Sequence, residues 1–234
     1  MAPMPAGQSN APSDRDFAEW NEAMVERYDI DRYYAESNSL VRWIERKRLS
    51  ALARLADVQP RDHLLEVGCG GGHVLQQFPQ ARRTGIDLST NMLRRARLRL
   101  NGSAHLLRGS ADRLPFADGA FQVVLCTEVL EHVPDPSAVL RELIRVAAPG
   151  GRVVVSIPNE RNIDRAKRML RRTPVLARVL RTLADEGNEW HLHQFDWAML
   201  ERNLQGVARV AARIAIPSVL VPIRYVASLE SART

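Results

Sequence analysis

Leu64-Leu-Glu-Val-Gly-Cys-Gly-Gly-Gly72 is the stretch that decides the fold. The apolar residues of 63–67 predict a short buried strand. The glycines after it let the backbone turn sharply and approach a ligand without a Cβ in the way. Three of them meet the spacing G-x-G-x-G: Gly68, Gly70 and Gly72. A dinucleotide fingerprint would need glycine in place of His73, and the phosphate loop G-x-x-x-x-G-K-[ST] is absent. The stretch therefore predicts a ligand-binding turn of another type.

A second acidic residue stands where the next strand should end. Gly85-Ile-Asp87 lies 21 residues after Glu66. An acidic residue at such a strand end can accept hydrogen bonds from both ribose hydroxyls of a nucleoside. Taken alone, Asp87 could instead be a helix cap. Together with Glu66 and the glycines, it favours a nucleoside-containing ligand.

Strands and helices alternate along the rest of the chain. Further strands are expected at 83–88, 105–107, 121–126, 152–157, 207–215 and 220–227. Helices are expected at 17–27, 39–56, 90–100, 137–146 and 196–204, with another beginning over 74–78. Such alternation predicts a parallel sheet with helices on both faces. The last two strands are joined by a short connection, so they must be antiparallel.

The charge of the chain is concentrated in blocks. There are 33 basic and 27 acidic residues, a net of +6. Residues 1–37 carry a net −5, residues 82–108 a net +6 and residues 161–181 a net +7. The basic surplus suggests a nucleic-acid partner, an anionic membrane, or only an arginine-rich composition. No RNA-binding appendage is apparent, so we expect no nucleic-acid partner.

The cysteines and the apolar runs of the sequence indicate the cellular compartment and the kind of membrane contact to expect. Cys69 and Cys126 are too few for a disulfide framework, so a reducing cytoplasm is expected. Residues 1–14 lack the apolar core of a signal peptide and predict a disordered tail. The apolar run 214–223 contains two prolines and is too short to cross a bilayer. Peripheral membrane contact through the basic segment 161–181 is one interpretation; the other is amphipathic helices with solvated arginines.

Four motifs in order carry a resemblance to a known family. After the glycine stretch come Gly85-Ile-Asp-Leu-Ser89, Gly109-Ser-Ala-Asp-Arg-Leu-Pro-Phe116 and Glu128-Val-Leu-Glu-His-Val-Pro-Asp135. The chain resembles class I S-adenosylmethionine-dependent methyltransferases over about residues 60–230, most of all the small-molecule branch that includes ubiquinone and menaquinone methylases. The resemblance implies an α/β, Rossmann-like, seven-stranded, mostly parallel sheet with an antiparallel last strand. It also implies a tail and cap helix at 1–37, a catalytic domain at 38–234 and a small helical cap inserted at 159–194.

The resemblance implies S-adenosylmethionine as cofactor and assigns residues to it. Glu66 and the loop of Gly68, Cys69, Gly70 and Gly72 would hold the methionine moiety. Asp87 would hold the ribose, Leu88 would lie against the adenine, and Ala111 would offer it a backbone N–H, with Asp112 beside. Ser110 stands where many relatives have Asp. Cys126 and Thr127 would lie near the sulfonium.

Methyl transfer by direct displacement needs an aligned acceptor, and a phenol also needs a base. The expected acceptor is a small molecule, phenol- or quinol-like, or another natural product or lipid-like compound. Candidate catalytic residues are His132, His193 and Glu128. If 128–132 is helical, Glu128, Glu131 and His132 share one face and resemble the metal cluster of ubiquinone-pathway O-methyltransferases. The alternative, which we favour, is that Glu-His is a local feature and that no divalent metal is bound.

Two segments are expected to meet the acceptor. Glu189-Trp-His-Leu-His-Gln-Phe195 precedes a helix, and its Trp190 and His191 are assigned to the substrate. Tyr28, Tyr33 and Tyr34, on the acidic N-terminal segment, are expected to close over the site, as N-terminal helices do in similar enzymes. Ordinary packing would explain the same residues.

Two other functions stay open. An RNA or protein methyltransferase is one, although the [DN]-P-P-[YFW] motif of adenine amino methylation is absent after the strand at 121–126. A cofactor-binding regulatory protein without turnover is the other. The acceptor atom and the oligomeric state cannot be read, because specificity resides outside the sheet.

Overall fold

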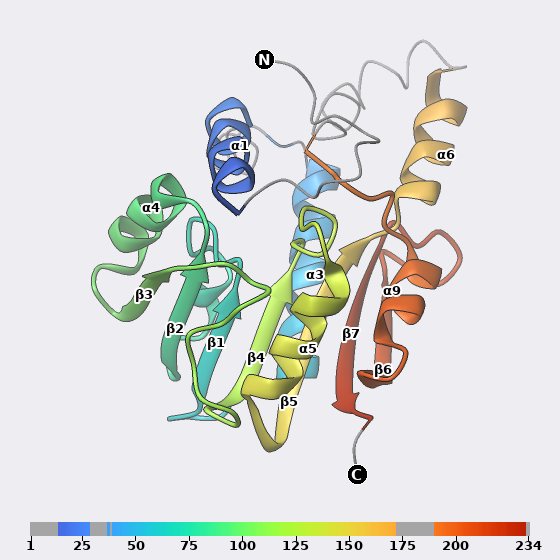
Figure 1. Cartoon of the computed structure of the whole chain (residues 1–234). Coiled ribbons are helices and arrows are strands. Elements are labelled where there is room, and N and C mark those ends of the chain that lie inside the picture. The colour runs from blue at the N-terminus through green and yellow to red at the C-terminus, as the bar shows by residue number, and fades with distance from the viewer. Residues whose placement is uncertain (1–13, 29–36, 38, 172–189, 233–234) are drawn as a thin grey trace.

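The computed structural model describes residues 14–28, 37, 39–171 and 190–232 (Figure 1). Seven strands form one sheet in the order β3-β2-β1-β4-β5-β7-β6. All neighbouring pairs are parallel except those of β7, which runs antiparallel to both β5 and β6. This confirms the expected mostly parallel sheet. The strands are β1 (His63–Val67), β2 (Arg82–Asp87), β3 (Ala104–Arg108), β4 (Phe121–Thr127), β5 (Ala147–Pro158), β6 (Ala208–Ile216) and β7 (Arg224–Ser231).

The helices divide between the two faces of the sheet (Figure 1). One apolar cluster joins α5 and α9 to one face, and a second joins α3 and α4 to the other. Successive residues of β4 alternate between the clusters, with Val123 in one and Val124 in the other, as a pleated strand requires. The helices are α1 (Asp14–Arg27), α3 (Ser39–Ala56), α4 (Thr90–Leu100), α5 (Pro136–Val146), α6 (Glu160–Arg171) and α9 (Trp197–Leu204).

Several expected elements differ in length: β5 begins at Ala147, five residues before its expected start, and prolines explain two further differences. The helix expected from residue 74 is only a single 3-10 turn, Leu75–Gln77, because Pro79 follows it and cannot continue a helix. β7 begins at Arg224 and not at 220, because Pro222 has no N–H to offer a neighbouring strand. The four residues lost from the strand lengthen the connection from β6 to β7.

The strand order places the site. It reverses at β1, whose neighbours are β2 on one side and β4 on the other, and ligands of open α/β sheets bind at the carboxyl ends of strands beside such a reversal. α1 lies over this edge, and α6 rises from it after β5 (Figure 1). α1 is held there by Glu22, whose carboxylate accepts a 3.0 Å hydrogen bond from the backbone of Asn91 on α4.

Three expectations lie partly or wholly outside the described residues. These are the disordered tail, Tyr33 with Tyr34, and the centre of the cap, 172–189. The described part of the cap consists of α6 and residues 190–194. Among the described residues, no helix combines the length and apolar character needed to cross a bilayer.

Candidate active site

The glycine loop after β1 is built by left-handed backbone. Gly68, Gly70 and Gly72 have φ of 69°, 48° and 80°, a region that side chains with a Cβ rarely adopt. The amides of Gly68 and Cys69 both donate to the carbonyl of Ile86 on β2, at 2.8 and 3.1 Å. The loop therefore folds back over the neighbouring strand, as its sequence predicts.

The loop glycines differ in what surrounds them. A Cβ on Gly68 would lie 2.3 Å from a methyl group of Val129, so this glycine is needed for packing. A Cβ on Gly70 would have no heavy atom within 4 Å among the described residues. Gly70 thus borders open space at the carboxyl end of β1, where a ligand can approach the backbone.

Asp87 ends β2 beside this space. Its two carboxylate oxygens accept hydrogen bonds from the backbone N–H groups of Gly70 (2.7 Å) and Ser89 (2.8 Å). Burial raises the pKa of Asp87, while these bonds act in the opposite direction. The helix cap considered as an alternative role belongs to Ser89, whose hydroxyl accepts from Met92 N at 3.1 Å.

Glu66 is a buried carboxyl group under the loop. Its side chain accepts a 3.2 Å hydrogen bond from the N–H of Leu75 and lies 3.5 Å from the hydroxyl of Thr127. Burial raises the pKa of Glu66 to about 8, which the nearby Arg48 partly opposes. The interaction with Thr127 connects the end of β1 to the end of β4.

The remaining residues assigned to the cofactor surround the same strand ends. Gly109 N donates to Asp87 O at 3.0 Å, which brings the segment after β3 against β2. Ser110 and Ala111 are half-buried there and Asp112 is exposed, while Leu88 accepts a 3.1 Å hydrogen bond from Arg108 at its carbonyl. Cys69 and Cys126 are both buried, which raises the pKa of each thiol, so neither is suited to be a nucleophile.

These residues fit S-adenosylmethionine. The open space at Gly70 allows a bulky group to meet the backbone, and Asp87 lies beside it with a carboxylate that can accept from ribose hydroxyls. Two acidic side chains at adjacent strand ends, Glu66 buried and Asp87 half-buried, suit a ligand that carries positive charge. The fit rests on this geometry together with the donor and acceptor chemistry of Glu66 and Asp87.

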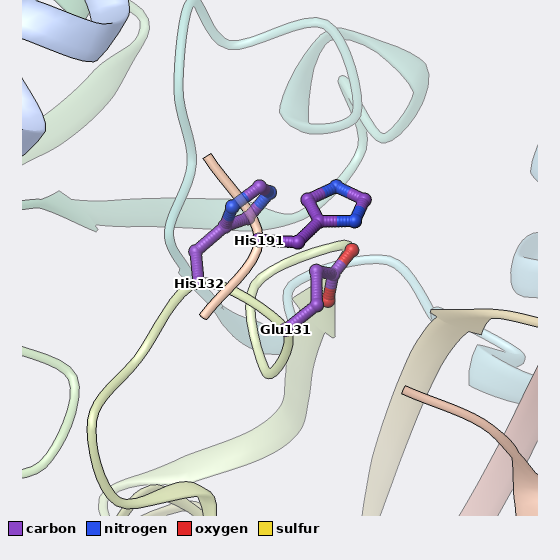
Figure 2. A group of neighbouring side chains, drawn as sticks. All are labelled: Glu131, His132 and His191. Carbon is purple, nitrogen blue, oxygen red and sulfur yellow. The ribbon is translucent and has the colours of Figure 1, made fainter. Parts of the chain in front are cut away.

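A second group of side chains lies beyond the end of β4. Figure 2 shows Glu131, His132 and His191 pointing toward one another, and one side-chain nitrogen or oxygen from each lies within 4.8 Å of the others. Glu131 and His132 come from the turn after β4, and His191 comes from the segment before α9. We call these three residues the acceptor cluster.

Hydrogen bonds fix the two segments of the acceptor cluster against each other. The carbonyl of Glu131 accepts from the backbone N–H of Leu192 at 2.9 Å. Nδ1 of His132 lies 3.1 Å from the carbonyl of Trp190; since a carbonyl only accepts, this nitrogen carries the hydrogen and Nε2 keeps its lone pair. Burial, reinforced by His191, lowers the pKa of His132 to about 3, so this imidazole is neutral.

Glu131 and His191 have contrasting surroundings. The Glu131 side chain is buried, its Oε2 has no hydrogen-bond partner in the described part of the chain, and burial raises its pKa, with Glu128 adding to the effect. Nδ1 of His191 instead donates to the carboxylate of Glu160, the first residue of α6. His191 is therefore one half of a carboxylate–imidazole pair.

Glu128 does not join the acceptor cluster, which corrects the shared helical face. Residues 128–132 form a turn, and Glu128 has φ of 54°, so its side chain leaves in another direction. Its carboxylate accepts from the hydroxyl of Ser156 at 2.8 Å and pairs with Arg224 at 2.6 Å. Of the three residues considered as a possible metal set, the structure therefore brings together only Glu131 and His132, and His191 is the third member of the group that it forms.

The other residues assigned to the substrate or to catalysis have two kinds of position. Some offer aromatic rings beside the acceptor cluster, and we call these rings the aromatic wall; others hold the turn after β4 in place. Nε2 of His193 donates to the carbonyl of Val133 at 2.9 Å, so this imidazole supports the turn after β4. Trp190 lies between Tyr28 and His132, with ring centroids 6.1 and 4.8 Å away. Glu160 was missed from the sequence, and the signal for it was its place two residues after the end of β5. Tyr28 is one of the three N-terminal tyrosines that were expected to close over the site. A polar hollow beside the cluster is lined by Glu160, Asp164, His191, His193 and Gln194.

Comparison with known proteins agrees with this geometry. Residues 65–155 match the family described as "Methyltransferase domain". A ubiquinone biosynthesis O-methyltransferase of Xanthomonas oryzae pv. oryzae is 35% identical over 148 residues, which cover 56% of this chain and 61% of that protein. A trans-aconitate 2-methyltransferase of Acidovorax ebreus is 30% identical over 66% of this chain and 55% of that protein. The chain thus spans between 41% and 61% of the length of the curated relatives that it matches.

Solved structures share the fold. The N-methyltransferase NodS from Bradyrhizobium japonicum, in complex with S-adenosyl-L-homocysteine, superposes with a TM-score of 0.66 at 17% identity, over 91% of this chain and 98% of that one. A putative methyltransferase from Bacillus halodurans has a TM-score of 0.57 at 20% identity, covering 73% of this chain and 72% of that one. The chain therefore carries a methyltransferase domain, and over that domain it resembles the class I S-adenosylmethionine-dependent methyltransferases.

Proposed function

We propose that this chain transfers a methyl group from S-adenosylmethionine to a hydroxyl oxygen of a small-molecule acceptor. The observation that carries the proposal is the position of the acceptor cluster at the end of β4, next to the glycine loop at the end of β1. The two sites are joined by Thr127 near Glu66 and by Val129 against Gly68. The names of the ubiquinone-pathway relatives support an oxygen acceptor.

In this proposal His191 is the general base. S-adenosylmethionine supplies a methyl group activated by its sulfonium. Because Nδ1 of His191 donates to Glu160, Nε2 can take the proton of an acceptor hydroxyl, and Glu160 then stabilises the imidazolium. His132, with a pKa of about 3, is too weak a base for this step and orients the acceptor instead.

The composition of the wall supports an aromatic acceptor of phenol or quinol type. Tyr28, Trp190 and His132 offer ring faces that can stack on a flat molecule and exclude water from it. The nearby hollow contains the carboxylates of Glu160 and Asp164. Those charges disfavour a polycarboxylate such as the substrate named for the trans-aconitate relative.

A bound divalent metal is the second candidate for activating the hydroxyl. Glu131, His132 and His191 would hold it, and they fit because each offers a nitrogen or oxygen to one point and Glu131 Oε2 lacks a partner in the described part of the chain. The metal would polarise the acceptor oxygen. We propose the metal-free form, which predicts full activity in excess chelator. Loss of activity that Mg²⁺ or Zn²⁺ restores would favour the metal.

The test of the proposed function is methyl transfer by the purified full chain. Methyl-labelled S-adenosylmethionine would be incubated with a catechol, a polycarboxylate and a primary amine, and products would be identified by mass spectrometry. We expect label on the catechol oxygen only. The variant Asp87→Ala, which removes the ribose carboxylate, controls for chemistry without the enzyme. Label on the amine or on the polycarboxylate alone would contradict the oxygen acceptor.

The same labelled cofactor separates the two other functions. Transfer to RNA or protein in a cell extract, with binding that weakens steeply as salt rises, would favour a macromolecular acceptor. Tight cofactor binding without transfer to any extract component would favour a regulatory protein. Neither result is expected, because His191 supplies a base for a small molecule, and Tyr28, Trp190 and His132 supply aromatic faces for it.

A further inference from the structure

The connection between β6 and β7 exposes three consecutive aliphatic side chains. Val219, Leu220 and Val221 are 81%, 88% and 56% exposed. We call them the apolar tip. Single exposed apolar residues are common on protein surfaces, but a contiguous group marks an interaction site more often. The tip is therefore the strongest apolar surface feature of the described residues.

The tip is held on a firm base. The carbonyl of Pro222 accepts hydrogen bonds from the side-chain amides of Asn159 (3.0 Å) and Asn162 (2.8 Å). The N–H of Ile223 donates to the carbonyl of Ile216 at 2.7 Å, which closes the connection. The fold itself thus presents the tip, so little ordering is needed when the tip meets a partner.

Positive charge lies beside the tip. Asn162 is in the first turn of α6, so its bond to Pro222 brings this helix against the connection. Arg161, Arg165 and Arg168 of α6 are exposed, and their spacing places them along one face. Arg161 also forms a 2.6 Å ion pair with Asp196. An apolar projection next to a row of arginines complements a surface that is anionic outside and apolar below.

The tip lies at the same edge of the sheet as the acceptor cluster. β7 begins at Arg224, directly after the connection, and the Arg224 side chain pairs with Glu128 in the turn that carries the cluster. α6 begins at Glu160, the partner of His191. A surface that contacts the tip and α6 would therefore lie close to the acceptor cluster.

We propose that the apolar tip and the arginine face of α6 dock this chain on an anionic lipid bilayer, with the tip inserted at the headgroup boundary. A projecting tip of three residues is far smaller than the roughly 800 Å² per partner of a stable protein interface. A second copy would also bring like charges together. The inference is independent of the acceptor, and it adds a second element to the membrane contact expected from segment 161–181.

Vesicle sedimentation with the full chain tests the docking. The vesicles are phosphatidylcholine alone, or phosphatidylcholine with about one third phosphatidylglycerol. We expect binding to the anionic vesicles, and a loss of about tenfold or more in partitioning for Val219→Ser combined with Leu220→Ser and Val221→Ser. The matched control is Leu98→Ser: Leu98 is 79% exposed on α4, among other arginines, and its replacement should change binding less than about twofold.

A second variant tests the charge. Arg165→Glu with Arg168→Glu should also weaken binding about tenfold, and added salt should reduce binding of the wild type. Should the triple variant fold poorly, Leu220→Ser alone replaces it, with thermal unfolding as the check. The proposal would be overturned if the wild type did not bind anionic vesicles, or if a tip variant bound them as well as the wild type does. So would a wild-type dimer that the tip variant converts to a monomer. Methyl transfer to a water-soluble acceptor should not change in any tip variant, which separates this inference from the proposed function.

Discussion

The cofactor half and the acceptor half of the site are built in different ways. Most of the cofactor half lies within residues 66–89, and the shape of this part comes from backbone: left-handed glycines, and carboxylates held by N–H groups. The acceptor half joins a turn after β4 to residues about sixty positions later, and its shape comes from side chains that meet across that distance. One half is local, and the other depends on the tertiary fold.

The two halves of the site should differ in how many substitutions they tolerate. A backbone-built site tolerates few substitutions, because each glycine or carboxylate fixes the path of the chain. A site built from side chains on a turn and a cap can be altered without moving the sheet. The two halves still touch, since Gly68 packs on Val129. They also share an electrostatic neighbour: burial is the main cause that raises the pKa of the Cys126 thiol, and Glu131 and Glu66 raise it further.

The largest effect is expected from the base of the acceptor half. His191→Gln should lower kcat about a thousandfold, because general base catalysis contributes 10²–10⁴-fold. Cofactor affinity should be unchanged, which a binding titration with S-adenosyl-L-homocysteine would measure. His193→Gln is the matched control, since its Nε2 already donates to Val133, and it should lower kcat less than about tenfold. Equal losses in the two variants would remove His191 as the base.

The next effect lies in the cofactor half. Asp87→Ala removes a carboxylate that can bind the ribose and that also organises Gly70 and Ser89, so cofactor affinity should fall about a hundredfold or more. Calorimetric titration with S-adenosyl-L-homocysteine measures it. Asp112→Ala, in the exposed part of the same site, should cost less than about tenfold. A larger loss at Asp112 than at Asp87 would contradict the assignment of the ribose.

The contrast also explains what the sequence could predict. The glycine spacing, the acidic strand ends and the alternation of elements are local signals, so β1, α3 and α4 begin and end where the pattern predicts them. S-adenosylmethionine could be inferred from the motifs because most of its site is made within one stretch of chain, residues 66–89. The main exceptions were two ends beside prolines, at Leu75–Gln77 and at the start of β7, and the early start of β5 at Ala147.

The acceptor half was predicted only in part, for a physical reason. His132 and His191 were recognised as candidates, but the pairing of His191 with Glu160 depends on where α6 begins relative to residue 191. Glu128 was grouped with Glu131 by helical spacing, and a left-handed residue at Glu128 broke that relation. Arg224, which neutralises Glu128, lies 96 residues away in sequence and no local pattern points to it.

The third prediction tests the contact between the halves with two glycines of similar φ. Gly68→Ala adds a methyl group 2.3 Å from Val129, so the free energy of unfolding should fall by about 2 kcal/mol or more. Gly70→Ala meets open space and should cost only the backbone strain, about 1 kcal/mol, yet weaken cofactor binding. Denaturant unfolding measures both. Val129→Ala should restore part of the loss in Gly68→Ala and none in Gly70→Ala; equal rescue would contradict the contact.

The smallest effect is the pH dependence that buried carboxyl groups give to stability. The pKa of Glu66 is raised to about 8 from 4.5, so the folded chain keeps a proton that the unfolded chain has lost within this window. Stability from this group is therefore complete below about pH 4.5 and lost as pH rises toward 8. From about pH 6 to about pH 7 the free energy of unfolding should fall by about 1 kcal/mol through Glu66.

Denaturant unfolding of Glu66→Gln and Glu131→Gln, at the same pH values, separates the contributions of the two halves to the pH dependence of the free energy of unfolding. Gln cannot titrate, so in Glu66→Gln the free energy of unfolding should decrease less as pH rises, and the difference from the wild type is the contribution of the cofactor half. Burial raises the pKa of Glu131 as well, so Glu131→Gln should flatten the part that belongs to the acceptor half. If the Glu66→Gln curve ran parallel to that of the wild type, Glu66 would be ionised in the folded chain, and the carboxyl under the glycine loop would have to be satisfied by a charge rather than kept neutral by burial.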